Sequence, residues 1–198
     1  MENSMKIYIR KQLTEAQHVM SAMLTDEGLL TYVEAAANAC IRAMRSGNKI
    51  MLAGNGGSAA DAQHIAGEFV SRFAFDRPGL PAIALTTDTS ILTAIGNDYG
   101  YENLFARQVQ AHAQKGDVLI AYSTSGGSLN IINALKEAQS RGVVCIGMSG
   151  NRGGIMKDLC QHYLEVPSAD TPKIQEGHAV LGHILCGLVE NAVFKVNI

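Results

Sequence analysis

Short apolar runs alternate with helical patterns from residue 47 onward, and this alternation constrains the fold more than any other feature of the chain. The runs are rich in β-branched side chains, and most of them are apolar along their whole length. Strands of this kind, separated by helices, are typical of a parallel sheet that helices cover on both faces. The expected strands are Lys49–Ala53, Ala82–Leu85, Val118–Tyr122, Val143–Met148 and Tyr163–Val166, and the expected helices span 58–73, 89–95, 102–114, 128–141 and 171–194.

The first 46 residues have helical spacing and contain no catalytic motif. Apolar side chains recur at helical intervals from Ile9 to Met23 and again from Leu29 to Met44, with a break near Asp26. Gly47 is the type of residue that ends a helix. We therefore predict one domain over 1–198, in which 1–46 form an N-terminal helical extension and 47–198 form the α/β core. Such an extension needs a surface to pack on, and a partner subunit can provide it.

Composition argues against several classes of function. Of the 198 residues, 47% are hydrophobic and 17% are charged, with a formal net charge of −2. The chain therefore lacks the excess of basic residues that would attract nucleic acids or anionic membranes. Its low content of charged residues suggests that other subunits cover part of the surface. No apolar run reaches the ~18 residues of a membrane span, and the first residues lack the apolar core of a signal peptide. The cysteines form no CxxC pair, which predicts buried, reduced thiols in the cytoplasm; they are Cys40, Cys145, Cys160 and Cys186.

A serine-rich loop, Ser123–Ser128, directly follows the expected strand Val118–Tyr122. Its hydroxyls and glycines lie between a strand and a helix, where backbone N–H groups and short hydroxyl donors suit a phosphate dianion. The loop contains no lysine, so it is not a Walker A nucleotide loop. The alternative is an ordinary turn in which Ser128 caps the following helix.

A glycine loop, Gly54–Ser58, follows the strand Lys49–Ala53 and leads into a helix that carries His64 and Glu68 one turn apart. An imidazole and a carboxylate at this spacing can chelate one divalent cation, or they can place a base beside a positioning group. A simple surface pair has the same spacing. The residues alone leave these alternatives open.

The last expected helix carries further polar residues. Thr171 and Pro172 resemble an N-cap and a first-turn proline, so the helix should begin there. Gln175 and Glu176 lie in its first turns, and His183 lies in an apolar stretch. A histidine in such a stretch is commonly a core residue, unless a metal ion or a partner such as Glu68 lies opposite it.

Taken together, these motifs resemble the sugar isomerase (SIS) domain family, and within it most closely the phosphoheptose isomerases. Each motif alone is weak, but their order and spacing match over essentially the whole chain. The matching segments are Gly54–Ser58, His64 with Glu68, Arg77–Gly79, Gly96–Asp98, Ser123–Gly126, Gln175–Glu176 and His183.

The resemblance implies a flavodoxin-like, five-stranded parallel sheet and a homotetramer with active sites at subunit interfaces. It implies conversion of sedoheptulose 7-phosphate to D-glycero-D-manno-heptose 7-phosphate, the first step toward the heptose of lipopolysaccharide or related surface glycans. Glu68 and His183 would be the catalytic acid/base pair. One zinc ion per subunit would be held by His64, Glu68, Gln175 and His183. The substrate would contact Asn55, Gly56, Gly57, Glu68, Asn97, Asp98 and Gln175, and its phosphate would contact Ser123, Thr124, Ser125 and Ser128.

These residue types suit the chemistry. A ketose–aldose interconversion moves a proton between C1 and C2 through an enediol, so one group works at carbon and another at oxygen. Our hypothesis assigns Glu68 to carbon and His183 to oxygen, while zinc either polarises the carbonyl or only organises the site. A zinc-bound carboxylate is a weaker base than a free one, which puts two roles of Glu68 in tension. Gln175 and His183 lie about 12 Å apart along a continuous helix. Joint ligation therefore requires that both lean together, that they come from different subunits, or that the helix starts later than expected.

Two other functions have a rationale in the sequence. Some relatives in the family bind the bacterial replication initiator without catalysis and lack the metal-site glutamate, so Glu68 favours the enzyme. A regulatory domain that senses sugar phosphates is the third interpretation. Such domains usually accompany a DNA-binding module, and no basic helix-turn-helix segment is evident in this chain.

Overall fold

The computed structural model describes residues 2–194, so residue 1 and residues 195–198 of the predicted domain range 1–198 lie outside the described residues. Its centre is a five-stranded sheet in the order β2-β1-β3-β4-β5, and every neighbouring pair of strands is parallel. This is the flavodoxin-like order, and it confirms the predicted α/β class. The strands are β1 (Ile50–Ala53), β2 (Ala82–Ala84), β3 (Val118–Tyr122), β4 (Val144–Gly150) and β5 (His162–Val166).

The predicted helices are present, with changes at their ends. The predicted helix 89–95 continues to Tyr99, and Gly100, with a φ of 85°, separates it from a 3-10 turn that replaces the start of predicted helix 102–114. A second 3-10 turn, Ile155–Leu159, was not predicted. The helices are α1 (Glu2–Thr25), α2 (Glu27–Arg45), α3 (Gly57–Val70), α4 (Thr89–Tyr99), α5 (Leu104–His112), α6 (Leu129–Ser140) and α7 (Thr171–Phe194).

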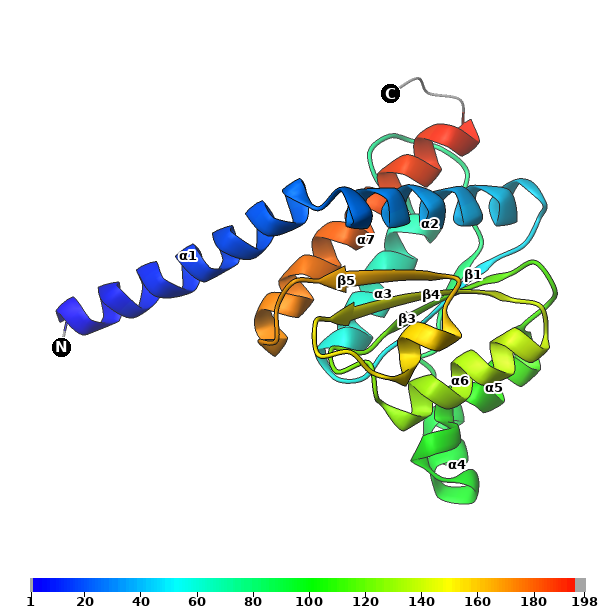
Figure 1. The fold of residues 1–198 in the computed structure, drawn as a ribbon. Helices are drawn as coiled ribbons and strands as arrows, with labels where there is room; N and C mark the ends of the chain where they lie inside the picture. The colour runs from blue at the N-terminus through cyan, green and yellow to red at the C-terminus, as the bar shows by residue number, and fades with distance from the viewer. Residues whose placement is uncertain (1, 195–198) are drawn as a thin grey trace.

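Helices cover both faces of the sheet, as the apolar strands require. Along β1, Ile50 and Leu52 face a core formed with α2, α3 and α7, whereas Met51 and Ala53 face a core formed with α5 and α6. Figure 1 shows α2 and α7 above the sheet and α4, α5 and α6 below it. Because the strands are parallel, their carboxyl ends meet at one edge, where open α/β sheets bind ligands.

The predicted break between the two N-terminal helices is a helix cap. The Asp26 carboxylate accepts a hydrogen bond from the Leu29 backbone N–H at 2.9 Å, and this bond starts α2 with a new axis. Met23, near the end of α1, is buried in the core, but Ile9 and Leu13 are exposed. The first part of α1 extends away from the body of the molecule (Figure 1).

Helix α7 is the one described helix whose length and apolar composition would suffice to cross a membrane. It packs against α2 and α3, and 44% of its most apolar window is buried inside the protein. Ile174, Leu185 and Val189 are among its residues in the core. A core helix passes the same test of length and composition, so this feature is weak evidence for membrane insertion.

Two of the predicted strand ends lie at the carboxyl edge of the sheet. Ser149 was expected to follow a strand that ends at Met148, but β4 continues through Ser149 to Gly150. Gly54 does follow β1 as predicted, and a Cβ at this position would overlap the backbone carbonyl of Ser58. Glycine at 54 therefore lets the first turn of α3 lie directly against the end of β1.

Replacing Gly54 by alanine should lower the free energy of unfolding by about 1–3 kcal/mol, because the new Cβ must push the backbone of α3 away from β1. Urea denaturation followed by circular dichroism measures the change. Gly67→Ala is the matched control, since Gly67 lies inside α3 with open space around its Cα, and alanine there should stabilise the helix slightly. Equal unfolding midpoints for Gly54→Ala and the wild type would contradict the argument.

Candidate active site

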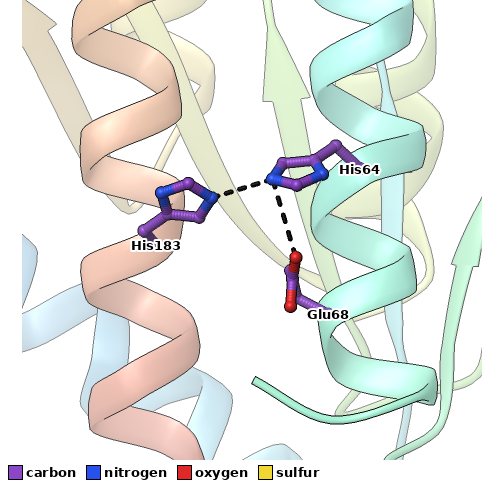
Figure 2. Close-up of side chains that lie close together, drawn as sticks. All are labelled: His64, Glu68 and His183. Atoms are coloured by element: carbon purple, nitrogen blue, oxygen red, sulfur yellow. Dashed lines mark hydrogen bonds and ion pairs between the residues drawn. The ribbon is translucent and has the colours of Figure 1, made fainter. Parts of the chain in front are cut away.

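Three side chains from two helices converge on one point at the protein surface. His64 and Glu68 lie one turn apart on α3, and His183 faces them from α7 (Figure 2). The Nε2 atoms of the two histidines are 2.8 Å apart, and His64 Nε2 lies 3.7 Å from Glu68 Oε1. The structure thus brings together three of the four residues predicted as metal ligands.

Close packing of α3 against α7 makes this convergence possible. Gly182 precedes His183, and a Cβ on Gly182 would lie 2.6 Å from Ile65 Cδ1. The missing side chain lets the two helix backbones approach where His64 and His183 face each other. The imidazole of His183 also lies beside Phe73, with ring centroids 5.7 Å apart.

The trio fits a zinc ion by its donor chemistry and spacing. Two imidazole nitrogens and a carboxylate oxygen lie within 4.8 Å of one another, and zinc accepts this combination of ligands. Three protein ligands leave a fourth position for water or substrate. The geometry does not support His183 as an ordinary core residue, because its ring is partly exposed and turned to His64. His64 and Glu68 are not an isolated pair on the helix surface, because His183 from α7 lies beside His64.

Gln175 lies elsewhere on α7. Its carboxamide packs against Gly57, with Nε2 2.5 Å from the position that a Cβ on Gly57 would take. Helix α7 is continuous from Thr171, so Gln175 and His183 remain about 12 Å apart along its axis. Gln175 therefore borders the glycine loop in this structure, and its role as a metal ligand stays a prediction.

The serine loop folds into a compact cluster of hydroxyls at the start of α6. The buried Ser123 hydroxyl lies 2.9 Å from the Ser128 hydroxyl and 3.5 Å from that of Ser125. Ser128 therefore takes the predicted N-cap position, but its hydroxyl points to Ser123 and does not bond to the helix. Hydroxyls and a helix N-terminus together suit an anion.

A network of amides connects the two loops. The Asn55 and Asn130 side chains exchange two hydrogen bonds, at 2.8 and 2.9 Å, and the Tyr101 hydroxyl donates to the side-chain Oδ1 of Asn55 at 2.9 Å. Asn130, in the first turn of α6, is buried. Sequence reasoning identified Asn55 but missed Asn130 and Tyr101. The position of Asn130 two residues after the serine loop was the only signal for it.

Four of the residues predicted to contact the sugar lie at the ends of two different helices. Gly56 and Gly57 lie at the start of α3, and Gly56 has a φ of 56° that favours glycine. Asn97 and Asp98 lie in the last turn of α4, where their side chains are exposed and hydrogen bond to each other at 2.7 Å. Contact of these two residues with a sugar stays a prediction, as do the roles predicted for Thr124 and the other loop residues.

A buried histidine lies near the carboxyl edge of the sheet. His178 on α7 packs against Tyr122, with ring centroids 5.6 Å apart, and neither of its ring nitrogens has a hydrogen-bond partner among the described residues. Burial lowers the pKa of His178 to about 4, an effect that the nearby Ser149 backbone opposes only in part. His178 is therefore neutral at pH 7.

Comparison with known proteins gives consistent matches over the chain. A family model described as SIS domain matches residues 12–150. The phosphoheptose isomerase of Burkholderia pseudomallei is 70% identical over 194 residues, which cover 98% of each protein. That of Aneurinibacillus thermoaerophilus is 58% identical and covers 96% of each.

Solved structures agree with these matches. The phosphoheptose isomerase of Neisseria gonorrhoeae superposes with a TM-score of 0.88 at 37% identity, covering 94% of this chain and 99% of that one. The phosphoheptose isomerase of Francisella tularensis gives a TM-score of 0.89 at 33% identity, covering 93% and 97%.

The buried His178 should make stability fall as the pH is lowered from about 6.5 to 4. Over this range the unfolded chain takes up a proton that the folded protein excludes, so the free energy of unfolding decreases by about 3 kcal/mol. Urea titrations at several pH values measure this loss. His178→Phe should remove this pH-dependent loss of unfolding free energy. His18→Gln, which changes an exposed histidine on α1, should leave the loss unchanged. Parallel pH curves for the wild type and His178→Phe would contradict the assignment.

Proposed function

The chain belongs to the SIS domain family, and because it is 70% identical to a phosphoheptose isomerase over nearly its whole length, we infer that it is an aldose–ketose isomerase of a heptose phosphate. The single structural observation that carries this inference is the convergence of Glu68, His64 and His183 at the surface. These groups can hold and move protons, as interconversion of a ketose and an aldose requires.

The substrate we propose is sedoheptulose 7-phosphate, and the product is D-glycero-D-manno-heptose 7-phosphate. The reaction would be the first step toward the heptose of lipopolysaccharide or related surface glycans. We place it in the cytoplasm, which agrees with four cysteines that are all free thiols.

Glu68 and His183 divide the proton transfers in this proposal. Glu68 takes the proton from C1 of the ketose and returns it to C2, so a hydrogen moves between neighbouring carbons through an enediol. His183 exchanges protons with the oxygens at these carbons. Phe73, beside His183, provides an apolar wall that limits water around the imidazole.

His64, Glu68 and His183 are the residues that would hold a zinc ion in one protomer. When bound, the ion supplies positive charge that stabilises an oxygen anion. Gln175 would add a fourth ligand only if its carboxamide left Gly57. The two roles of Glu68, as zinc ligand and as base, oppose each other, because coordination lowers the pKa of the carboxylate and weakens it as a base.

The serine loop would bind the phosphate through the hydroxyls of Ser123, Thr124, Ser125 and Ser128 and the N-terminus of α6. Asn55 and the glycines at 56 and 57 would line the sugar, together with Gln175. Asn97 and Asp98 would contact it from α4. The amide network of Asn55 with Asn130 would keep the sugar-binding side of the glycine loop in register with the phosphate loop.

Glu68→Gln should lower turnover of sedoheptulose 7-phosphate by at least 10³-fold while leaving the fold intact, because glutamine cannot accept the carbon-bound proton. A coupled assay of aldose formation measures turnover, and circular dichroism checks the fold. Glu137→Gln, which changes an exposed salt bridge on α6, is the matched control and should retain full activity. Dialysis against a chelator, followed by zinc, tests the metal in the same assay.

Substantial turnover by Glu68→Gln would remove this residue from the mechanism, and unchanged turnover after zinc removal would limit zinc to another role. An unmodified chain that shows no turnover at any zinc concentration, and that binds the replication initiator, would favour the non-enzymatic alternative. The presence of Glu68 beside both histidines favours the enzyme.

We also propose that the protein is a homotetramer whose active sites lie at subunit interfaces. The supporting observation is an apolar stripe on α1 that runs beyond the body of the protomer. Met20 and Met23 pack on the core, but Ile9 and Leu13, on the same face, are 54% and 67% exposed. A stripe of this kind requires a partner to cover it.

Leu13→Asp should shift the protein to a lower molar mass, because it places a charge in the middle of the proposed interface. Light scattering after size exclusion measures the mass. Thr14→Asp adds the same charge to the neighbouring exposed position outside the stripe and should leave the mass unchanged. The proposal fails if Leu13→Asp remains a tetramer or if the wild type is a monomer.

A further inference from the structure

A buried ion pair lies behind the candidate active site. Arg77, in the segment after α3, and Glu190, on α7, have side chains that are 2% and 1% exposed. Arg77 Nε donates to Glu190 Oε1 at 2.8 Å. Sequence analysis identified the Arg77 motif without a role and did not identify Glu190.

The Glu190 carboxylate holds the segment after α3 through its backbone. It accepts the N–H groups of Phe73 at 2.8 Å and Ala74 at 2.7 Å, in addition to the guanidinium of Arg77. Burial alone would raise the pKa of Glu190, but these donors outweigh burial and keep its pKa below the ordinary value. The carboxylate therefore stays ionised and fully hydrogen-bonded.

The remaining nitrogens of Arg77 reach the last turn of α3. One donates to the backbone carbonyl of Phe69 at 2.6 Å, and the other donates to the backbone carbonyl of Glu68 at 2.8 Å. Carbonyls at a helix end lack partners within the helix, so the guanidinium completes this end of α3. The Glu68 carbonyl belongs to the residue whose carboxylate faces His64 and His183.

The pair thus connects the two helices of the site at a fixed distance. Glu190 follows His183 by about two turns on α7, and Arg77 donates a hydrogen bond to the backbone carbonyl of Glu68 on α3. The same carboxylate fixes Phe73, whose ring lies beside His183.

Stability alone does not account for this arrangement. A buried ion pair is commonly no more stabilising than well-packed apolar side chains of similar volume, because both charges lose their hydration. What an apolar pair could not do is join two helix backbones by hydrogen bonds of defined direction. The planar guanidinium, with donors on three nitrogens, suits such a junction better than lysine does.

We propose that Arg77 and Glu190 are positioning residues that set the separation of Glu68 from His183. The inference rests on the proposed function, since it gives these two residues their roles in proton transfer. A displacement of about 1 Å between reacting groups can cost a hundredfold in rate, so a junction that fixes two helices has a direct catalytic consequence.

The test compares Arg77→Lys and Glu190→Gln with the wild type. Lysine keeps the charge but cannot bond Glu190 and both α3 carbonyls together, and glutamine keeps the shape but loses the charge. Each variant should lower kcat by about tenfold or more, leave KM within about twofold, and weaken zinc binding measured by competition with a chromogenic chelator. Crystal structures of the variants should show the last turn of α3 displaced from His183.

Asp117→Asn is the matched control. Asp117 is another buried carboxylate that pairs with a cation, Lys49, at 2.6 Å, and it accepts backbone N–H groups of Lys49 and Gln114. It precedes β3 and therefore lies at the amino edge of the sheet, opposite the site. This variant should lose stability by thermal denaturation but keep kcat and zinc affinity.

The positioning role is overturned if kcat and zinc affinity of both site variants change no more than those of Asp117→Asn, or if α3 stays in place in their crystal structures. The structures and zinc titrations need no turnover. An unmodified chain without isomerase activity therefore counts against the proposed function and leaves these two measurements to decide whether the junction holds α3 against α7.

Discussion

The close packing of α3 against α7 is the contact on which the rest of the site depends. It requires a glycine wherever a side chain would separate the two helices. Gly57, at the start of α3, and Gly182, near the middle of α7, are two such positions. Gly57 leaves room for the Gln175 carboxamide, and Gly182 leaves room for Ile65. Because both helices also cover the same face of the sheet, their relative position is fixed by the core as well as by each other. The histidines and Glu68 then converge without any contribution from a flexible loop.

The sequence predicted the sheet well because the strands are buried on both faces. A run such as Val118–Tyr122 is apolar throughout, and its boundaries in the structure are those predicted. Boundaries that depend on single hydrogen bonds or on packing were less accurate. The extension of β4 to Gly150 requires β5 as a partner, and the 3-10 turn at Ile155–Leu159 depends on burial of Met156. Neither effect has a local signature.

The site was predictable where residues lie close in sequence and less so where the fold brings them together. The spacing of His64 and Glu68 already placed both on one helix face. His183 was ambiguous because its neighbours on α7 are apolar, and only the partner helix shows that its ring faces His64. Arg77 and Glu190 could not be paired from the sequence, since 113 positions separate them. Gln175 shows the opposite case, in which a residue predicted as a metal ligand lies against Gly57.

The serine loop, the glycine loop and the group of His64, Glu68 and His183 follow one another in an order that matches the proposed substrate. The phosphate of a heptose 7-phosphate is at one end of the carbon chain, and the reacting carbons C1 and C2 are at the other. The serine loop connects to Asn55 through Asn130, and Asn55 lies at the glycine loop, where α3 begins. From Gly57 to His64 the helix rises about 10 Å. A substrate anchored by its phosphate at the serine loop would therefore pass the amide pair and Gln175 before its reacting end met Glu68. Under the proposed function, the serine loop and the groups proposed to transfer protons lie on different strand–helix connections because a single loop could not serve both ends of the sugar.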